Sequence, residues 1–291
     1  MQTQLRQAVV VAFGRTPYCK ARKGSFAQLH PVEYGAQTLL GVLARVPQLR
    51  PEDIGDVIMG CAMPFGVQGG NMPDCVTAQT VNRYCSSGLQ TIATAANAIR
   101  CGEEDVVIAG GVESMSLVPM LVGAEDADPW LAEHRPEVYT TMGITAENVA
   151  RQWGISRADM DAMAVESHRR AAQAQAGGCF DGQIIPITVP GPDGGEVVVC
   201  RDEGSRPGTT AETLAGLKPC FLENGSVTAA TSSQMTDGAG FVVLMSEEKA
   251  AELGVKPLAR FVSFATGGVP AEVMGVGPIE AVPKALRKTG L

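Results

Sequence analysis

The chain has 291 residues, of which 45% are hydrophobic and 19% are charged, a balance typical of a globular protein rather than a disordered or fibrous one. Its formal net charge is −8 and its isoelectric point is near 5.0, so the sequence lacks the basic character of a nucleic-acid-binding protein. Its basic cluster, Lys20, Arg22 and Lys23, is interpreted as a solvated loop.

Two further features indicate where the protein works. No apolar run approaches the roughly 18 residues that a membrane-spanning helix needs, and Met1–Gln7 lacks the layout of a secretion signal. We therefore expect a cytoplasmic protein with no membrane partner. No two cysteines form a Cys-x-x-Cys pair, so no metal site is predicted, and most thiols are expected to be buried and free.

Hydrophobic patterns in the first third of the chain predict alternating strands and helices. Strands are expected at Gln7–Ala12, Val57–Met59, Val76–Cys85 and Val106–Ala109, and helices at Pro31–Val46 and Ser86–Arg100. The second helix is expected to bury a face formed by Leu89, Ile92, Ala93, Ala96 and Ile99. A strand–helix–strand unit of this kind requires a parallel sheet.

The rest of the chain predicts an insertion followed by a partial repeat. Helices are expected at Thr145–Gln152 and Ser156–Gly177, a hairpin at Ile184–Val189 and Glu196–Cys200, and a returning strand at Gly240–Met245. Leu258–Phe264 and Pro278–Lys288 then repeat the strand-then-helix order of Ala8–Val46. Because duplicated α/β units normally complete a sheet, we expect a second half that stops early.

Cys85 lies where a predicted strand meets a predicted helix, and Ser86-Ser87-Gly88 follow it. Unpaired amides and the helix dipole at such a position favour a thiolate and can stabilise an oxyanion on a thioester carbonyl. Gly88 lets a ligand or another backbone approach closely. Gly110-Gly111 lacks the spacing of a phosphate-binding loop and is interpreted as a tight turn near Cys85. Taken alone, a cysteine at such a junction is more often a core residue.

The residues around Cys85 resemble the nucleophile segment of the thiolase family. They read Val81-Asn82-Arg83-Tyr84-Cys85-Ser86-Ser87-Gly88-Leu89-Gln90. Stretches that agree with the family in order and spacing are Ala109-Gly110-Gly111-Val112-Glu113-Ser114-Met115-Ser116, residues 141–150, Ser232-Ser233-Gln234-Met235-Thr236-Asp237-Gly238-Ala239 and Val273-Met274-Gly275-Val276-Gly277-Pro278. The Ser-Ser-Gly-Leu-Gln and Ser-Gln-Met forms resemble the degradative, 3-ketoacyl-CoA branch.

The resemblance implies an α/β fold in which two similar core halves pack into five layers, αβαβα, with a loop subdomain inserted in the first half. It divides this chain into the first part of the amino-terminal core (1–117), the inserted subdomain (118–204), the return of that core (205–250) and the start of an incomplete carboxy-terminal core (254–291).

The family cleaves 3-ketoacyl-CoA with CoA, or runs the reverse Claisen condensation, through an acyl-cysteine intermediate. The resemblance therefore implies an acyltransferase of fatty-acid β-oxidation or related lipid metabolism, with CoA and acyl-CoA as substrates and no metal or redox cofactor. It also implies a homodimer, because family members usually associate through the first core half.

The resemblance also implies roles for individual residues. Cys85 matches the acyl carrier, Ser233 the contact to the pantetheine arm of CoA, and Arg206 a basic residue by its nucleotide end. Met142 and Met274 match methionines that line the acyl pocket. Each has a structural alternative: Ser233 a turn hydroxyl, Arg206 a surface charge, and the methionines ordinary core residues.

Parts of the family pattern are missing. The sequence has no Asn-Glu-Ala-Phe stretch for a water-holding oxyanion hole, no Gly-His-Pro stretch for the activating His, and no Cys-Ile-Gly-Gly-Gly-like stretch for the acid/base Cys. Its histidines are His30, His134 and His168, in other contexts, and only Asn71–Cys75 stands where the family has an additional helix. Since positioned acid/base groups contribute roughly 10² to 10⁴-fold in rate, these losses matter.

Three hypotheses follow. The chain is an active thiolase-type enzyme, or one part of a split enzyme whose second polypeptide supplies the missing His and Cys. Alternatively it is a non-catalytic acyl-CoA-binding or interaction protein. In the third hypothesis it is a truncated product with no stable function, since an open second half exposes sheet edge and apolar surface.

Overall fold

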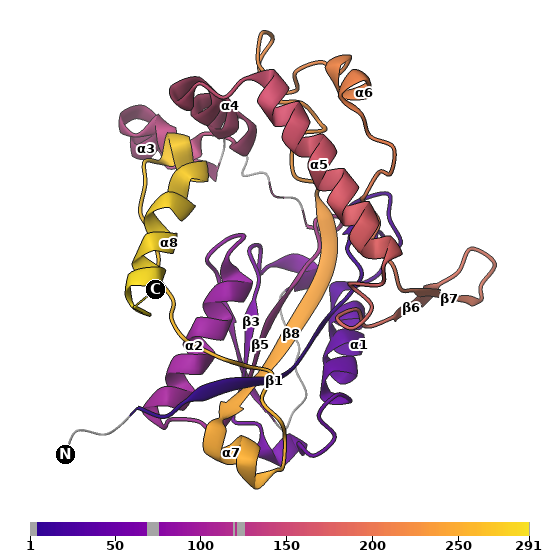
Figure 1. The fold of residues 1–291 in the computed structure, drawn as a ribbon, viewed down its shortest axis with the longest axis vertical. Helices are drawn as coiled ribbons and strands as arrows, with labels where there is room; N and C mark the ends of the chain where they lie inside the picture. Colours follow the sequence, from indigo (N-terminus) through magenta and orange to yellow (C-terminus); the bar gives the residue numbers. More distant parts are fainter. Residues whose placement is uncertain (1–4, 69–75, 119, 121–125, 291) are drawn as a thin grey trace. The chain divides into compact units, whose positions relative to one another are not determined.

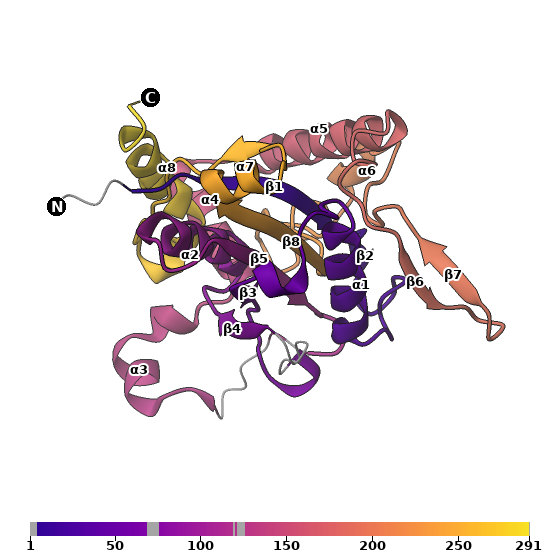
Figure 2. The ribbon, with the colours of Figure 1, turned by 90° about the horizontal axis from the view of Figure 1, so that it is seen from below.

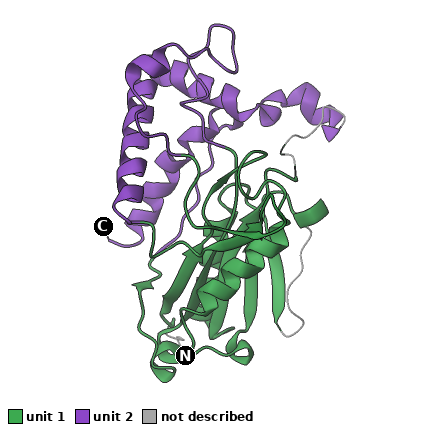
Figure 3. Cartoon of the chain, turned by 90° about the vertical axis from the view of Figure 1, so that its right-hand side faces the viewer, with its two compact units in different colours: residues 1–120, 180–204, 235–262 green, residues 121–179, 205–234, 263–291 purple. Residues whose placement is uncertain are grey.

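The computed structural model describes residues 5–68, 76–118, 120 and 126–290 (Figure 1). The chain forms two compact units, which Figure 3 distinguishes by colour. Unit 1 comprises residues 1–120, 180–204 and 235–262, and unit 2 comprises residues 121–179, 205–234 and 263–291. None of the described helices is both long and apolar enough to cross a membrane.

Unit 1 is an α/β unit built on a mixed sheet. Its strands are β1 (Ala8–Arg15), β2 (Cys19–Lys20), β3 (Asp56–Gly60), β4 (Thr77–Val81), β5 (Val106–Glu113), β6 (Ile187–Pro190), β7 (Glu196–Val199), β8 (Thr236–Ser246) and β9 (Ala259–Arg260). Its helices are α1 (Pro31–Leu43), α2 (Ser87–Cys101) and α7 (Glu247–Glu252), with 3-10 turns η1 (Pro51–Asp53) and η2 (Gly66–Gln68).

The strand order of the main sheet is β4-β3-β5-β8-β1-β9, and β2 pairs with β8 beside that path. β3 is parallel to both β4 and β5, so the predicted crossover from β4 through α2 to β5 is confirmed, with β3 between the two strands. β8 is antiparallel to β5 and to β1, which makes the sheet mixed. Only Ala259–Arg260 of the strand expected near residue 260 forms, and it pairs with β1.

Helices cover both faces of this sheet. Alternate residues of a strand point to opposite faces, so Ile108 of β5 packs in the cluster that contains Tyr34 and Val42 of α1. Its neighbours Val107 and Ala109 pack with Ala95, Ala96 and Ile99 of α2. The two helices therefore lie on opposite faces of the sheet (Figure 1). Strands buried on both faces explain the nearly continuous apolar runs in the sequence.

The expected buried face of α2 is confirmed at Ala93, Ala96 and Ile99 and is wrong at Leu89. Leu89 is 60% exposed, whereas Thr91 and Ala95 are fully buried. The reason is a close approach of the helix to the sheet: a Cβ added to Gly60 of β3 would lie 2.8 Å from the backbone carbon of Ser87. At that separation only small side chains fit between the first turn of α2 and the sheet, so the large Leu89 lies outside.

The expectation that most cysteines are buried is wrong for the described residues. Cys19 and Cys61 are buried, and the exposed cysteines are Cys85, Cys101, Cys179, Cys200 and Cys220. Several of the exposed ones lie in turns or at element ends, where side chains face solvent more often than within a strand. Cys75 and the link that contains it, Asn71–Cys75, lie outside the described residues.

The hairpin of β6 and β7 belongs to unit 1, although the insertion was expected to span residues 118–204. Figure 2 shows the hairpin projecting from this unit. Its base is held by the guanidinium of Arg15, which donates to both carboxylate oxygens of Asp202 at 2.7 and 2.9 Å. Ile187, Val189 and Val199 also join the α1-side core. Residues 205–234, expected in the returning core, instead belong to unit 2.

Unit 2 is helical. Its elements are α3 (Pro129–His134), η4 (Pro136–Tyr139), α4 (Met142–Trp153), α5 (Arg157–Ala176), α6 (Ala211–Ala215), η5 (Ala271–Val276) and α8 (Gly277–Arg287). The predicted capping pattern of α5 is confirmed: the Asp159 N–H donates to the Ser156 hydroxyl, and the Ser156 N–H donates to the Asp159 carboxylate.

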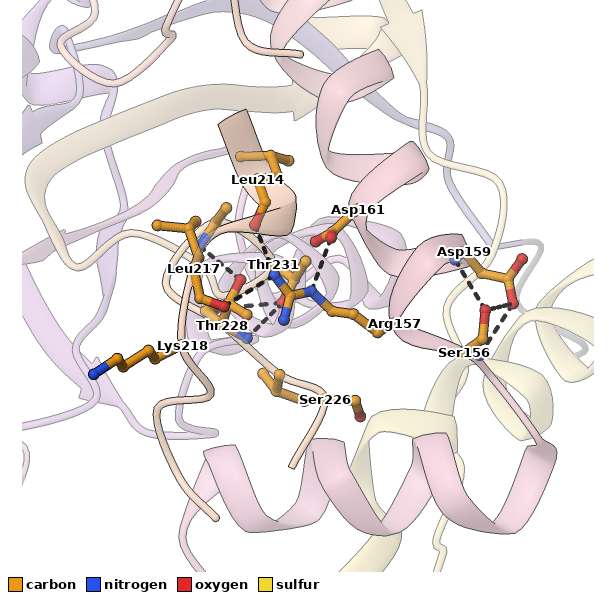
Figure 4. A network of polar contacts seen from close by, with 12 residues as sticks. Ser156, Arg157, Asp159, Asp161, Leu214, Leu217, Lys218, Ser226, Thr228 and Thr231 are labelled. Carbon is orange, nitrogen blue, oxygen red and sulfur yellow. Dashed lines mark hydrogen bonds and ion pairs between the residues drawn. The ribbon is translucent and has the colours of Figure 1, made fainter. Parts of the chain in front are cut away.

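Arg157 fixes the segment after α6 on the start of α5 (Figure 4). Its Nε donates to the carboxylate of Asp161 at 2.8 Å, and its Nη2 donates to the carbonyls of Leu214 (2.7 Å) and Leu217 (3.2 Å). Asp161 is only 6% exposed, so the arginine offsets a carboxylate that would otherwise be buried without a counter-charge.

A buried carboxylate on α4 fixes a second segment of unit 2. Glu147 is 6% exposed and accepts hydrogen bonds from the N–H groups of Ser226 and Val227 and from the Ser226 hydroxyl, at 2.8–3.0 Å. Burial alone raises the pKa of Glu147, but these donors outweigh it and hold the pKa below its usual value of 4.5. The charged form is therefore the one that stabilises the fold.

We expect Glu147→Gln to lower the free energy of unfolding by about 1–3 kcal/mol near neutral pH, because a charged acceptor of several donors is lost. A carboxyl whose folded pKa is depressed stabilises above its unfolded pKa and loses that contribution as pH falls through the folded one. The difference from wild type, measured by urea unfolding, should therefore shrink below about pH 4.5. Glu223→Gln, at an exposed position of the same unit, is the control. A difference independent of pH would contradict this account.

Candidate active site

A cavity of about 440 Å³ opens in unit 1 at the carboxyl ends of β3 and β5. Its walls include Gly60 at the end of β3, Gly110–Glu113 of β5 and Gly238–Gly240 of β8. The first turn of α2 closes another side through Ser87 and Gly88, and Cys85 lines the cavity as well. The volume lies in the range typical of small-molecule sites.

Glycines let the strands around this cavity pack closely together. A Cβ on Gly110 would lie 2.2 Å from the carbonyl oxygen of Gly240, and one on Gly111 would lie 2.6 Å from the carbonyl oxygen of Gly60. Side chains at these positions would force the strands apart. The interpretation of Gly110-Gly111 as a tight turn is thus wrong, because both lie within β5, where close packing of strands requires glycine.

The turn that carries Cys85 is longer and more constrained than expected. β4 ends at Val81, not at Cys85, and α2 begins at Ser87. Tyr84 has φ of 47°, in the left-handed region that non-glycine residues rarely adopt. The Ser87 hydroxyl accepts the Arg83 N–H at 2.8 Å and donates to the Tyr84 carbonyl, which closes the turn. A conformation of this kind persists only where surrounding contacts hold it.

Cys85 presents its thiol at the amino terminus of α2. The residue is exposed and lines the cavity. Among the described residues, the N–H groups of Gly88 and Leu89 have no hydrogen-bond acceptor, so the first turn of the helix keeps unpaired donors. A Cβ on Gly88 would meet nothing within 4 Å, so the side on which a side chain would point is open, while the nitrogen of Gly88 lies close to Gly60 of β3.

Glu113, at the end of β5, is a cavity residue to which the sequence assigned no role. Its carboxylate accepts the Ala62 N–H at 2.7 Å and the Gln68 side-chain amide at 2.9 Å. Burial, helped by the charge of Glu113, raises the pKa of the Cys61 thiol to about 11. Cys61 is therefore protonated at neutral pH and is no second nucleophile. An acidic residue that ends an otherwise apolar strand with two glycines was the sequence signal for Glu113.

The other residues predicted for the site belong to unit 2. Ser233 and Arg206 are exposed, and the Arg206 N–H donates to Nδ1 of His168 at 3.2 Å. Met142, at the first position of α4, is 53% exposed, and Met274, in η5, is 42% exposed. The alternative that these methionines are core residues is therefore wrong. Their role in an acyl pocket, like the CoA contacts of Ser233 and Arg206, stays a prediction.

The structure brings together the elements that carry the two methionines. α4 packs against η5, and the Asn148 side-chain amide of α4 donates to the Glu272 carbonyl of η5 at 3.0 Å. A Cβ on Gly275 would lie 3.8 Å from Val149, an ordinary van der Waals distance. Met142 and Met274 thus lie on adjacent elements of one unit.

No histidine lines the cavity within the described residues. His30 caps α1 and accepts the Val32 N–H at 3.3 Å, and His134 stacks on Trp130 with ring centroids 4.6 Å apart. His168 accepts the Arg206 N–H. The described part of the chain also holds no cluster of three or more His, Cys, Asp or Glu side chains arranged to bind a metal ion.

Comparison with known proteins gives a consistent result. Residues 8–248 match the family model described as thiolase, N-terminal domain. The 3-ketoacyl-CoA thiolase of Bacillus subtilis is 48% identical over 99% of this chain and 78% of its own length, and the human peroxisomal 3-ketoacyl-CoA thiolase is 40% identical over 100% and 72%.

A solved structure agrees with these sequence comparisons. The Bacillus anthracis acetyl-CoA acetyltransferase superposes with a TM-score of 0.88 at 37% identity, covering 99% of this chain and 78% of its own. The expected α/β thiolase fold is therefore confirmed. The cavity, the cysteine at the amino terminus of α2 and these matches lead to one conclusion: the chain belongs to the thiolase family.

Proposed function

We propose that the chain is a thiolase-type acyltransferase that holds an acyl group on Cys85 while it cleaves a 3-ketoacyl-CoA with CoA. The observation that carries this proposal is the exposed thiol of Cys85 on the wall of the cavity, directly before the unpaired amides of α2. The names of the relatives, 3-ketoacyl-CoA thiolase and acetyl-CoA acetyltransferase, support it and favour it over a non-catalytic acyl-CoA-binding protein.

The reaction runs in two half-reactions. The Cys85 sulfur attacks the 3-keto carbon, the bond between carbons 2 and 3 breaks, and carbon 2 takes a proton as acetyl-CoA leaves. The sulfur of free CoA then attacks the acyl-cysteine carbonyl, and Cys85 regains its proton as the shortened acyl-CoA departs. Since the atoms balance with CoA and acyl-CoA alone, we propose no metal or redox cofactor.

The amides of Gly88 and Leu89 suit the charge that develops in both half-reactions. Each addition places negative charge on a carbonyl oxygen, and fixed backbone donors stabilise such an oxyanion more than they stabilise the neutral carbonyl. Because these N–H groups have no partner among the described residues, they are free to bind that oxygen. Ser233 and Arg206 are proposed to bind CoA, and Met142 and Met274 to line the acyl chain.

The cavity has few side chains that could transfer protons during the reaction. Its ionisable lining residues are Tyr18, Tyr84, Cys85 and Glu113. We therefore propose that a second polypeptide supplies a His and a second Cys, in addition to homodimer formation. The same proposal places the chain in fatty-acid β-oxidation in the cytoplasm; the supporting observation is that relatives named 3-ketoacyl-CoA thiolase occur in bacteria.

Incubation with acetyl-CoA or acetoacetyl-CoA should add one acetyl group to Cys85, which peptide mass spectrometry would detect. Cys101, exposed at the far end of the same helix, is the internal control and should stay unmodified. Cys85→Ser should abolish the adduct. An unmodified Cys85, or equal modification of both thiols, would overturn the proposed function.

Turnover should depend on added acid/base groups. We expect the chain alone to release acetyl-CoA from acetoacetyl-CoA and CoA roughly 10² to 10⁴-fold more slowly than a mixture with a polypeptide that carries the Gly-His-Pro and Cys-Ile-Gly-Gly-Gly-like stretches. The measurement is the initial rate with and without that polypeptide. No turnover in either sample would reject the catalytic proposal, and full rate without the polypeptide would reject the need for it.

A further inference from the structure

The side chain of Asn82 spans the gap between β3 and the turn that carries Cys85. The ladder of β3 and β4 ends near Val81, whose carbonyl accepts the Cys61 N–H at 3.2 Å. One residue on, the Asn82 Nδ2 donates to the Ala62 carbonyl at 2.9 Å. Its Oδ1 accepts the Tyr84 N–H at 2.8 Å. A side chain thus continues the ladder where the backbone turns away from the sheet.

Glu113 holds the other end of this connection. Its carboxylate accepts the Ala62 N–H at 2.7 Å, on the same residue whose carbonyl accepts Asn82. The carboxylate is itself fixed by the Gln68 side-chain amide at 2.9 Å. A continuous path of hydrogen bonds therefore runs from Glu113 through Ala62 and Asn82 to Tyr84.

The path ends at the strained residue next to the nucleophile. Tyr84, with φ of 47°, is 75% exposed, so side-chain packing does not hold it in the left-handed region. Backbone hydrogen bonds must do so instead. The Tyr84 N–H is bound by Asn82, and its carbonyl is bound by Ser87. The direction of the following Cys85 side chain depends on these contacts.

The two hydrogen bonds at position 82 require a side-chain amide. The same short side chain must donate to one carbonyl and accept from one N–H at the same time. Aspartate lacks the donor, and alanine lacks both groups. At position 113 an ionised carboxylate accepts two amide donors at once, and a glutamine there would place a donor against one of them.

We propose that Asn82 and Glu113 are positioning residues that set the direction of the Cys85 thiol through Ala62 and Tyr84. Neither is assigned to contact the substrate. The inference rests on the proposed function for its biological meaning, but the orientation of the thiol can be measured without any CoA substrate.

The test measures how fast iodoacetamide alkylates Cys85 relative to Cys101 in the same molecules, by peptide mass spectrometry. Iodoacetamide alkylates the thiolate, which the amides at a helix amino terminus favour, so Asn82→Ala and Glu113→Gln, which let the sulfur move away from those amides, should each lower the ratio about tenfold. Gln79→Ala is the matched control, because this exposed residue of β4 bonds Asp56 and lies off the path. It should leave the ratio unchanged.

Two further readouts separate positioning from general loss of structure. The double variant should be no slower than the slower single variant, because both changes interrupt one path, whereas independent effects would multiply. The variants that fold should acylate with a lower limiting rate at an unchanged half-saturating acetoacetyl-CoA concentration. Should Asn82→Ala fail to fold, Asn82→Asp, which keeps the Tyr84 acceptor, takes its place.

An unchanged alkylation ratio in folded variants, or multiplicative effects in the double variant, would overturn the positioning role. A wild-type chain whose Cys85 alkylates preferentially but never forms an acyl adduct would instead overturn the proposed function and leave the positioning result standing. The two failures are therefore distinguishable.

Discussion

The short turn between β4 and α2 is the constraint on which the site depends. It reverses the chain within a few residues, keeps Tyr84 in the left-handed region and places Cys85 before the helix. The side chains of Ser87 and Asn82 bind its backbone from either side. Without this turn, the unpaired amides of α2 and the thiol of Cys85 would have no fixed relation to each other.

In the sheet of unit 1, one end of β5 packs against helices and the other end lines the cavity. Residues near the amino end of β5, such as Val107 and Ile108, are fully buried between α1 and α2. Towards the carboxyl end the strand changes to Gly110 and Gly111, which pack closely against the backbones of β8 and β3 and line the cavity. The apolar half therefore holds the helices in place, and the glycine half lines the cavity next to Cys85.

Many elements of both units could be predicted from local pattern, because short-range periodicity determines strands and helices. The β4–α2–β5 crossover, the capping of α5 by Ser156 and the hairpin near residue 193 all follow from neighbouring residues. Contacts between residues that are far apart in the sequence do not follow from local pattern. Arg15 and Asp202 are 187 positions apart, yet their ion pair helps to hold the hairpin in unit 1.

In the candidate site, too, local pattern predicts some features and contacts between distant residues determine the others. The sequence identified Cys85 through its flanking letters but missed the left-handed Tyr84, because no local pattern requires it. The bond of Glu113 to Ala62 joins residues 51 positions apart and depends on the order of the strands. The exposure of Leu89 likewise follows from the close approach of α2 to Gly60, which periodicity alone does not reveal.

We expect the amides at the start of α2 to bind the carbonyl oxygen of an acyl group on Cys85. Isotope-edited infrared spectroscopy of the ¹³C-acetylated protein tests it most directly. Two hydrogen bonds polarise the carbonyl, so its stretch should lie at lower frequency than that of a small acetyl thioester in water. A stretch at the same or higher frequency would mean that the amides do not bind the acyl group, and the account would be wrong.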